Sequence, residues 1–361
     1  MTDQHPKRIV VKVGSSSLTD PDGRLDPAKV RSVVSAVVEV RRLGVRCVLV
    51  TSGAIAAGLE PLGMARKPKD VPSLQAAASV GQGRLIHEYQ KAFARRRIAV
   101  GQVLLTQSDI LHRESYVHAQ HAIDRLLALG VVPVVNENDA TGVAEIRFGD
   151  NDRLAALVAT MMGADLLVIL SDIDGIYTDD PSRPSARRLT IVEDPSELDQ
   201  VKGGRSGSAI GSGGMISKIE AVRTAAAAGI DSVVAAATEP RVVLRVVKGE
   251  PVGTRVIGRT HKTHNRKAWI AFARSAQGKI TVDPGARTAL SDGKKSLLPA
   301  GITAIDGVFA VGDVVAICDR DGHIFARGIS SYGSDELPAL MGRRLPDGAR
   351  EVVHRDSMVI L

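Results

Sequence analysis

The chain has 361 residues, more than one hydrophobic core usually organises, so we expect two domains. Hydrophobic residues make up 44% and charged residues 24%, a balance that excludes an intrinsically disordered chain. The net charge is +7, which fits either a nucleic-acid partner or acidic small molecules. No apolar stretch reaches the ~18 residues of a membrane span and no signal-peptide core follows Met1, so we expect a cytoplasmic protein without a membrane partner.

Strand and helix signals alternate along the first 260 residues. Asp26 and Pro27 are suited to the N-cap and first helical position of a helix that ends before Gly44. This alternation predicts an α/β fold with a mostly parallel central sheet covered by helices on both faces. We expect strands at 8–13, 45–50, 98–105, 131–135, 166–170 and, as the last, 232–236, and helices at 27–43, 74–95, 115–129, 154–162 and 216–228.

The alternation of strand and helix signals ends after residue 258. Residues 259–275 contain a basic stretch, which is interpreted as a solvated linker or as an anion-contacting segment. Short strand-like runs separated by turn residues then predict a small, mainly β domain at 276–361. The predicted organisation is therefore a domain at 1–258, a basic linker at 259–275 and a second domain at 276–361.

Small, polar or charged residues follow four of the predicted strands. Ligands of an open parallel sheet bind outside the carboxyl ends of its strands. Each run by itself could be an ordinary turn, but four that meet at one edge of a sheet predict a ligand site. The four runs are Lys12 to Ser17, Thr51 to Ala54, Asn136 to Asp139 and Ser171 to Gly175.

Lys12 and Lys218 are candidate phosphate ligands. Lys12 lies within an otherwise apolar strand, so it is either an edge-strand lysine that reaches water or a phosphate contact beside Gly14. Lys218 lies in the first turn of a predicted helix that follows the glycine-rich segment 203–214, which is either a flexible linker or an anion site. Neither segment matches the P-loop or the dinucleotide-binding pattern, which disfavours those folds.

These residue types suit phosphoryl transfer to a carboxylate. The reaction needs an in-line geometry and cations around the γ-phosphate, which two lysines and Mg²⁺ supply. It needs no catalytic base, because a carboxylate is already ionised near pH 7. Asn151 and Asp152 either cap the following helix or act in the site, where Asn151 would bind substrate and Asp152 would orient the lysines.

Seven sequence blocks in chain order resemble the amino acid kinase superfamily, and within it the bacterial glutamate 5-kinases with a C-terminal PUA domain. A further block in the tail, residues 296–302, is similar to the PUA part of these proteins. The likeness covers nearly the whole chain. The seven blocks are 10–14, 50–58, 78–82, 101–106, 133–139, 148–152 and 211–215 with Lys218.

The resemblance implies ATP-dependent phosphorylation of the L-glutamate side chain with Mg²⁺, as the first step of proline biosynthesis. It also implies feedback inhibition by proline, a glutamyl phosphate reductase as partner and a homo-oligomer. Ser171 and Ser212 stand where these proteins often have Thr. The implied roles are Lys12, Lys218 and Asp152 in catalysis; Ser52, Gly53, Asp139 and Asn151 in glutamate binding; and Lys12, Gly14, Ser171, Asp172, Ser212, Gly213, Gly214, Met215, Ile216, Ser217 and Lys218 in ATP binding.

Two other classes of function stay open at this point. One is another member of the same superfamily, such as an aspartate, acetylglutamate or UMP kinase. The other is an RNA-binding PUA protein with a silent kinase domain. The near-neutral, aromatic-poor residues 276–361 argue against nucleic acid as the partner.

Overall fold

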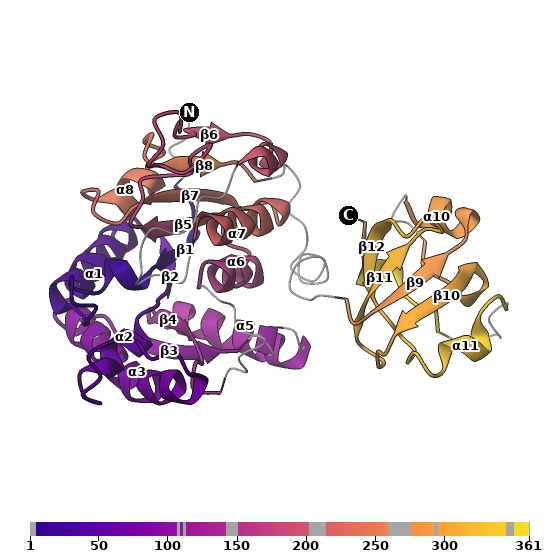
Figure 1. The fold of residues 1–361 in the computed structure, drawn as a ribbon, viewed down its shortest axis with the longest axis horizontal. Helices are drawn as coiled ribbons and strands as arrows, with labels where there is room; N and C mark the ends of the chain where they lie inside the picture. The colour runs from indigo at the N-terminus through magenta and orange to yellow at the C-terminus, as the bar shows by residue number, and fades with distance from the viewer. Residues whose placement is uncertain are drawn as a thin grey trace. The chain divides into compact units, whose positions relative to one another are not determined.

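The computed structural model describes residues 5–106, 109–110, 113–141, 151–201, 214–258, 276–291, 295–343 and 350–360. The chain forms two compact units, residues 1–262 and 263–361 (Figure 1). The expected linker, 259–275, lies outside the described residues, so the domain bounds drawn from the sequence stay predictions. None of the helices in the described ranges is long and apolar enough to cross a membrane.

The first unit is built on an eight-stranded sheet in the order β3-β4-β2-β1-β5-β7-β8-β6. Neighbouring strands are parallel, except that β8 runs antiparallel to β7. The expectation that residues 232–236 form the last strand is wrong, because β8 follows. The strands are β1 Arg8–Val13, β2 Arg46–Val50, β3 Val100–Leu105, β4 Val132–Glu137, β5 Leu166–Ser171, β6 Ile191–Val192, β7 Asp231–Ala236 and β8 Thr254–Val256.

Helices cover both faces of this sheet, which confirms the predicted α/β class. Figure 1 shows α1, α2, α3 and α8 on one face and α5, α6 and α7 on the other. The helices are α1 Pro27–Arg41, α2 Ala54–Leu59, α3 Val71–Ala94, α5 Arg113–Ala128, α6 Asn151–Met162, α7 Met215–Ala227 and α8 Val242–Val247.

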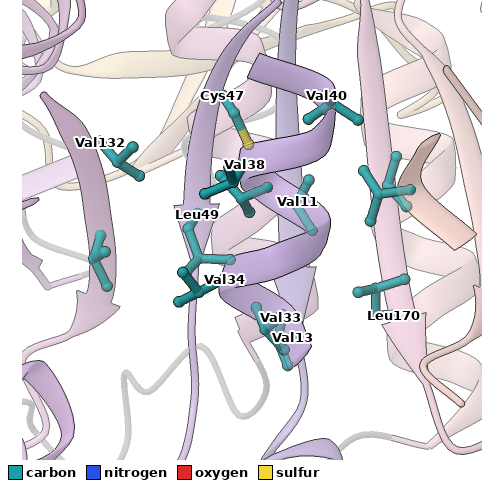
Figure 2. Packing of buried hydrophobic residues seen from close by; sticks show 14 of the residues in the cluster. Val11, Val13, Val33, Val34, Val38, Val40, Cys47, Leu49, Val132 and Leu170 are labelled. Carbon is teal, nitrogen blue, oxygen red and sulfur yellow. The ribbon is translucent and has the colours of Figure 1, made fainter. Parts of the chain in front are cut away.

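Helix α1 illustrates how the sequence builds the core. It begins as expected, because the Asp26 side chain accepts a hydrogen bond from the Ala28 N–H at 2.7 Å and Pro27 needs no partner. Its valines, including Val34, pack against Leu49 of β2 in one buried cluster (Figure 2). Burial of one such side chain contributes about 1.5–3 kcal/mol, so this face fixes the helix on the sheet and with it the loops at the strand ends.

The second unit is the small, mainly β body that the sequence predicts. Its five-stranded sheet has the order β10-β9-β11-β12-β13 and packs on a separate hydrophobic core around Ile280, Phe309 and Ile317. The elements are β9 Gly278–Val282, α10 Pro284–Ser291, β10 Ile302–Gly307, β11 Val314–Cys318, β12 Ile324–Ile329, α11 Leu337–Leu340 and β13 Met358–Ile360.

Candidate active site

The four strands with polar carboxyl ends are adjacent and parallel, in the order β4-β2-β1-β5. Parallel neighbours present their carboxyl ends at one edge of the sheet, so the predicted convergence of the four runs is confirmed. Lys12 on β1 pairs in register with Val50 on one side and Ile169 on the other. The interpretation of Lys12 as an edge-strand lysine is therefore wrong.

Asp152 joins the two candidate lysines. Its Oδ1 lies 2.5 Å from Lys12 Nζ and its Oδ2 lies 3.2 Å from Lys218 Nζ. Asp152 is fully buried, and Lys12 and Lys218 are 2% and 4% exposed. These three charged groups lie together in a water-poor place, where electrostatic attraction is strong because little water screens it. The two ammonium groups are candidate contacts for an anionic ligand.

Two helix ends place these charges at the edge of the sheet. Asp152 is the second residue of α6, and Lys218 lies in the first turn of α7, which is capped by Gly214. The two helices pack against each other. The Ser217 hydroxyl donates to Gly214 O at 2.8 Å and also lies 3.4 Å from Asp152 Oδ2. Helix N-termini carry partial positive charge, which adds to the attraction for a phosphate.

The Asn151 side chain crosses from α6 to the end of β2. Its Nδ2 donates to Thr51 O at 2.5 Å, to Ser52 Oγ at 3.0 Å and to Asn136 Oδ1 at 2.8 Å. Asn151 and Ser52, both candidate substrate ligands, are thus in direct contact. The interpretation of Asn151 as a residue that only caps its own helix is wrong, since its hydrogen bonds go to other elements.

A glycine turn begins α2 directly after Ser52. Gly53 has φ +101°, in the left-handed region that a side chain strains, and it is the N-cap of α2. Asp139 lies half-buried in a turn after β4, which is closed by the Thr141 N–H donating to Asn138 O. The candidate substrate ligands Ser52, Gly53, Asp139 and Asn151 therefore come from β2, the β4 turn and α6.

The candidate nucleotide residues lie beyond β1, at β5 and α7. The Ser171 hydroxyl donates to Asp172 Oδ1 at 2.9 Å at the end of β5. Ile216 is exposed at the start of α7, whereas Met215 beside it is buried. Beside β1, a Cβ built on Gly14 would lie 3.6 Å from Lys12 Nζ, so glycine keeps this approach to the ammonium group open. Ser212 and Gly213 lie outside the described residues.

Sequence reasoning gave no roles to four residues that support the site. Asn136 Nδ2 donates to Gln82 Oε1 at 2.6 Å, which links α3 to Asn151. Tyr89 and Thr51 share a hydrogen bond of 2.9 Å behind β2. Burial raises the pKa of Tyr89, so its hydroxyl stays neutral. Asn136 and Gln82 both lie within sequence blocks that carry the family resemblance, and this was the one feature of the sequence that could have indicated a role for them.

Comparison with protein-family models identifies the family of the chain. The model of the amino acid kinase family matches residues 7–236, which include every site residue described above. The chain belongs to the amino acid kinase family. A PUA domain model matches residues 278–347 of the second unit.

Relatives of this family match the chain almost from end to end. A protein of Thermobifida fusca named glutamate 5-kinase is 46% identical over 98% of this chain and 93% of its own length. Another of that name, from Streptomyces coelicolor, is 48% identical over 98% of this chain and 96% of its own length. The solved structure of carbamate kinase from Giardia lamblia bound to AMP-PNP covers 70% of this chain and 99% of its own, with a TM-score of 0.54 and 17% identity, which shows a shared fold.

Proposed function

We propose that this amino acid kinase transfers the γ-phosphoryl group of ATP to the side-chain carboxylate of L-glutamate, giving L-glutamyl 5-phosphate and ADP. The observation that carries the proposal is the Asp152 carboxylate, which holds Lys12 and Lys218 together at the ligand edge of the sheet. The relatives named glutamate 5-kinase support glutamate as the acceptor, since they match nearly the whole chain.

Lys12 and Lys218 act on the transferring phosphoryl group. Negative charge spreads over its equatorial oxygens in the transition state, and buried ammonium groups stabilise that charge strongly because little water screens them. Asp152 holds the two ammonium groups at a fixed separation before ATP binds, so little reorganisation is needed during the reaction. No residue has to remove a proton, because the acceptor carboxylate is ionised near pH 7.

The acceptor side is formed by Ser52, Gly53, Asp139 and Asn151. A zwitterionic substrate needs acceptors for its ammonium group and donors for its α-carboxylate. The Asp139 carboxylate suits the ammonium group, and the Ser52 hydroxyl and backbone N–H groups near Gly53 suit the α-carboxylate. A left-handed glycine at position 53 keeps that backbone free of a side chain.

The nucleotide side is formed by Lys12, Gly14, the β5 end and the segment that leads into α7. Ser171 and Asp172 contact the nucleotide, and Ile216 covers an apolar part of it. Residues Ser212, Gly213, Gly214, Met215, Ser217 and Lys218 line the phosphates. Mg²⁺ belongs to this reaction as the complex with ATP. Both oxygens of Asp152 already face lysines, so in our proposal the phosphate oxygens hold the ion.

The product chemistry suggests the wider role. An acyl phosphate hydrolyses readily in water, so a reductase that receives it directly is the expected partner, in the first step of proline biosynthesis. Feedback inhibition by proline, a homo-oligomeric state and a cytoplasmic location complete the proposal. The family resemblance supports all of these.

The experiment is hydroxylamine trapping of the acyl phosphate. Purified protein with ATP and Mg²⁺ should form a hydroxamate with L-glutamate, and far less with aspartate or acetylglutamate. ADP release should depend on glutamate and on Mg²⁺. Hydroxamate formation with aspartate or acetylglutamate instead would identify another kinase of the same family. Salt-sensitive RNA binding by the full chain without any hydroxamate would favour the RNA-binding alternative.

A further inference from the structure

The orientation of the Asn151 amide is fixed by a backbone carbonyl. Thr51 O can only accept a hydrogen bond, so the group that faces it at 2.5 Å must be the Nδ2 amino group and not Oδ1. The same Nδ2 also lies within hydrogen-bond distance of Ser52 Oγ and Asn136 Oδ1, so its two hydrogens are shared among three acceptors. The Asn151 carbonyl oxygen has no hydrogen bond within the described parts of the chain.

The orientation of the Asn151 amide also fixes the orientations of the Asn136 and Gln82 side-chain amides. Because Asn151 Nδ2 is a donor, the Asn136 atom at 2.8 Å is its Oδ1, and the Asn136 Nδ2 therefore points to the other side. That Nδ2 donates at 2.6 Å to Gln82, which must present Oε1. Thr51 O thus sets the polarity of a chain of three amides, Asn151, Asn136 and Gln82. Aligned amides polarise one another, which strengthens each bond.

We propose that Asn136 and Gln82 are positioning residues that hold the Asn151 amide so that its Oδ1 accepts a hydrogen bond from the α-ammonium group of the substrate. This inference rests on the proposed function, since it assigns one substrate group to one atom of that site. A buried acceptor oxygen with no hydrogen bond among the described residues requires a donor, and the ammonium group supplies the N–H donors of a free amino acid.

Burial explains why the arrangement needs support from α3. Asn136 is 1% exposed and Asn151 is 7% exposed, so neither has bulk water as an alternative partner. Loss of the Gln82 acceptor would leave the Asn136 amino group without a partner in a dry place, where an unpaired donor is costly. The Asn136 side chain would then rotate towards another acceptor, and its Oδ1 would no longer accept the hydrogen bond from Asn151 Nδ2.

The experiment compares three variants of α3. Gln82→Met removes the acceptor at nearly constant length, and Gln82→Glu keeps an acceptor oxygen. Gln90→Met, at an exposed position on the same helix, is the matched control. Hydroxamate formation gives the glutamate KM and kcat, and competition gives the Ki of glutarate, which lacks only the ammonium group.

We expect Gln82→Met to raise the glutamate KM about tenfold, the effect of one lost hydrogen bond to a charged group. The kcat, the ATP KM and the glutarate Ki should stay within about twofold, because phosphoryl transfer and carboxylate binding use other groups. Gln82→Glu should restore the glutamate KM to within about threefold of the parent value. Gln90→Met should match the parent protein.

Two results would overturn the inference. One is an unchanged glutamate KM in a folded Gln82→Met protein. The other is a parallel rise of the glutamate KM and the glutarate Ki, which would indicate general damage to the site. Thermal melting establishes that each variant is folded, and Asn136→Leu provides an independent second break in the chain of amides. If trapping shows that another amino acid is the acceptor, the proposed function fails, and that amino acid with its des-amino analogue then decides the positioning role.

Discussion

Gly58 of α2 and Gly81 of α3 meet where the two helices cross, and neither position has room for a methyl group. A Cβ on Gly81 would lie 1.8 Å from Ala54 O, and a Cβ on Gly58 would lie 1.9 Å from Ala77 O. The atoms in the way are backbone atoms, which cannot rotate aside as a side chain can. Since α2 begins right after Gly53, this close crossing also determines where Ser52 and Gly53 sit.

Replacement of Gly81 by alanine should force α2 and α3 apart. We expect Gly81→Ala to lower the free energy of unfolding by about 1–3 kcal/mol or more, because overpacking moves backbone. The glutamate KM should rise, since the Ser52 turn moves with α2. Gly83→Ala on the same helix is the control. Its Cβ would meet nothing within 4 Å, so it should be neutral or stabilising by up to about 1 kcal/mol. Equal melting temperatures of the two variants would contradict the close crossing.

Asp152→Asn should be strongly destabilising. The change removes the carboxylate that pairs with both buried ammonium groups, and breaking a buried ion pair from one side costs about 3–5 kcal/mol. Glu60→Gln removes the charge from the exposed pair with Arg84 and should cost less than about 1 kcal/mol. Urea unfolding of both variants measures the difference. A similar midpoint for the two would show that the Asp152 pairs are not stabilising.

Lys218→Ala should act on the rate more than on binding. Loss of a group that contacts the transition state should lower kcat roughly 100-fold or more. The glutamate KM should stay within about threefold, because the acceptor site is separate. Lys69→Ala, at an exposed position before α3, is the control. An unchanged kcat would remove Lys218 from the proposed mechanism.

Asp139→Ala should act mainly on glutamate binding. A lost charge-assisted hydrogen bond to the substrate ammonium group raises the glutamate KM about tenfold or more. The ATP KM should change little, since the proposed nucleotide site lies at β5 and α7. Asp22→Ala, in an exposed turn, should behave like the parent protein. Normal glutamate saturation of Asp139→Ala would undo this assignment.

Cys47 should be chemically silent in the folded protein. Burial in the β2 core raises its pKa to about 12, although Arg41 acts in the opposite direction. At pH 8 only about 10⁻⁴ of the thiol is ionised, and the thiolate is the reactive form. A Cys318→Ala variant isolates the Cys47 signal. We expect no reaction with a disulfide reagent in buffer and one thiol per chain in urea. Rapid labelling of the folded variant would contradict this burial.

Much of the fold was predictable because its long elements carry clear patterns. Apart from α2 and β6, which were not expected, the strands and helices from β1 to β7 match the sequence expectation closely, since each has a long apolar run between turn residues. Strand β8 has only three residues and β6 only two, too short for any period to emerge. Helix α8 was missed because its run of valines suits a strand. Packing against α1 makes it helical in spite of that propensity.

The site was predictable at the level of strand ends and not at the level of contacts. Lys12 stood out because a charge interrupts an apolar strand, but its central place depends on β5, more than 150 residues later. The contact between Gln82 and Asn136 spans 54 positions and arises from the way α3 and β4 are brought together. Spacing along a chain gives no access to such pairs, because tertiary packing alone creates them.

The central position of β1 has a consequence for how such kinases diversify. In the proposed site, the acceptor ligands Ser52, Gly53 and Asp139 follow strands β2 and β4 on one side of β1, the nucleotide residues Ser171 and Asp172 lie at the end of β5 on the other side, and Lys12 lies between them. Substitutions around Ser52 or Asn136 can therefore reshape the choice of acid without disturbing the triphosphate. An ancestral kinase domain can therefore acquire a new acceptor substrate through changes on the acceptor side of β1, while the nucleotide side stays the same.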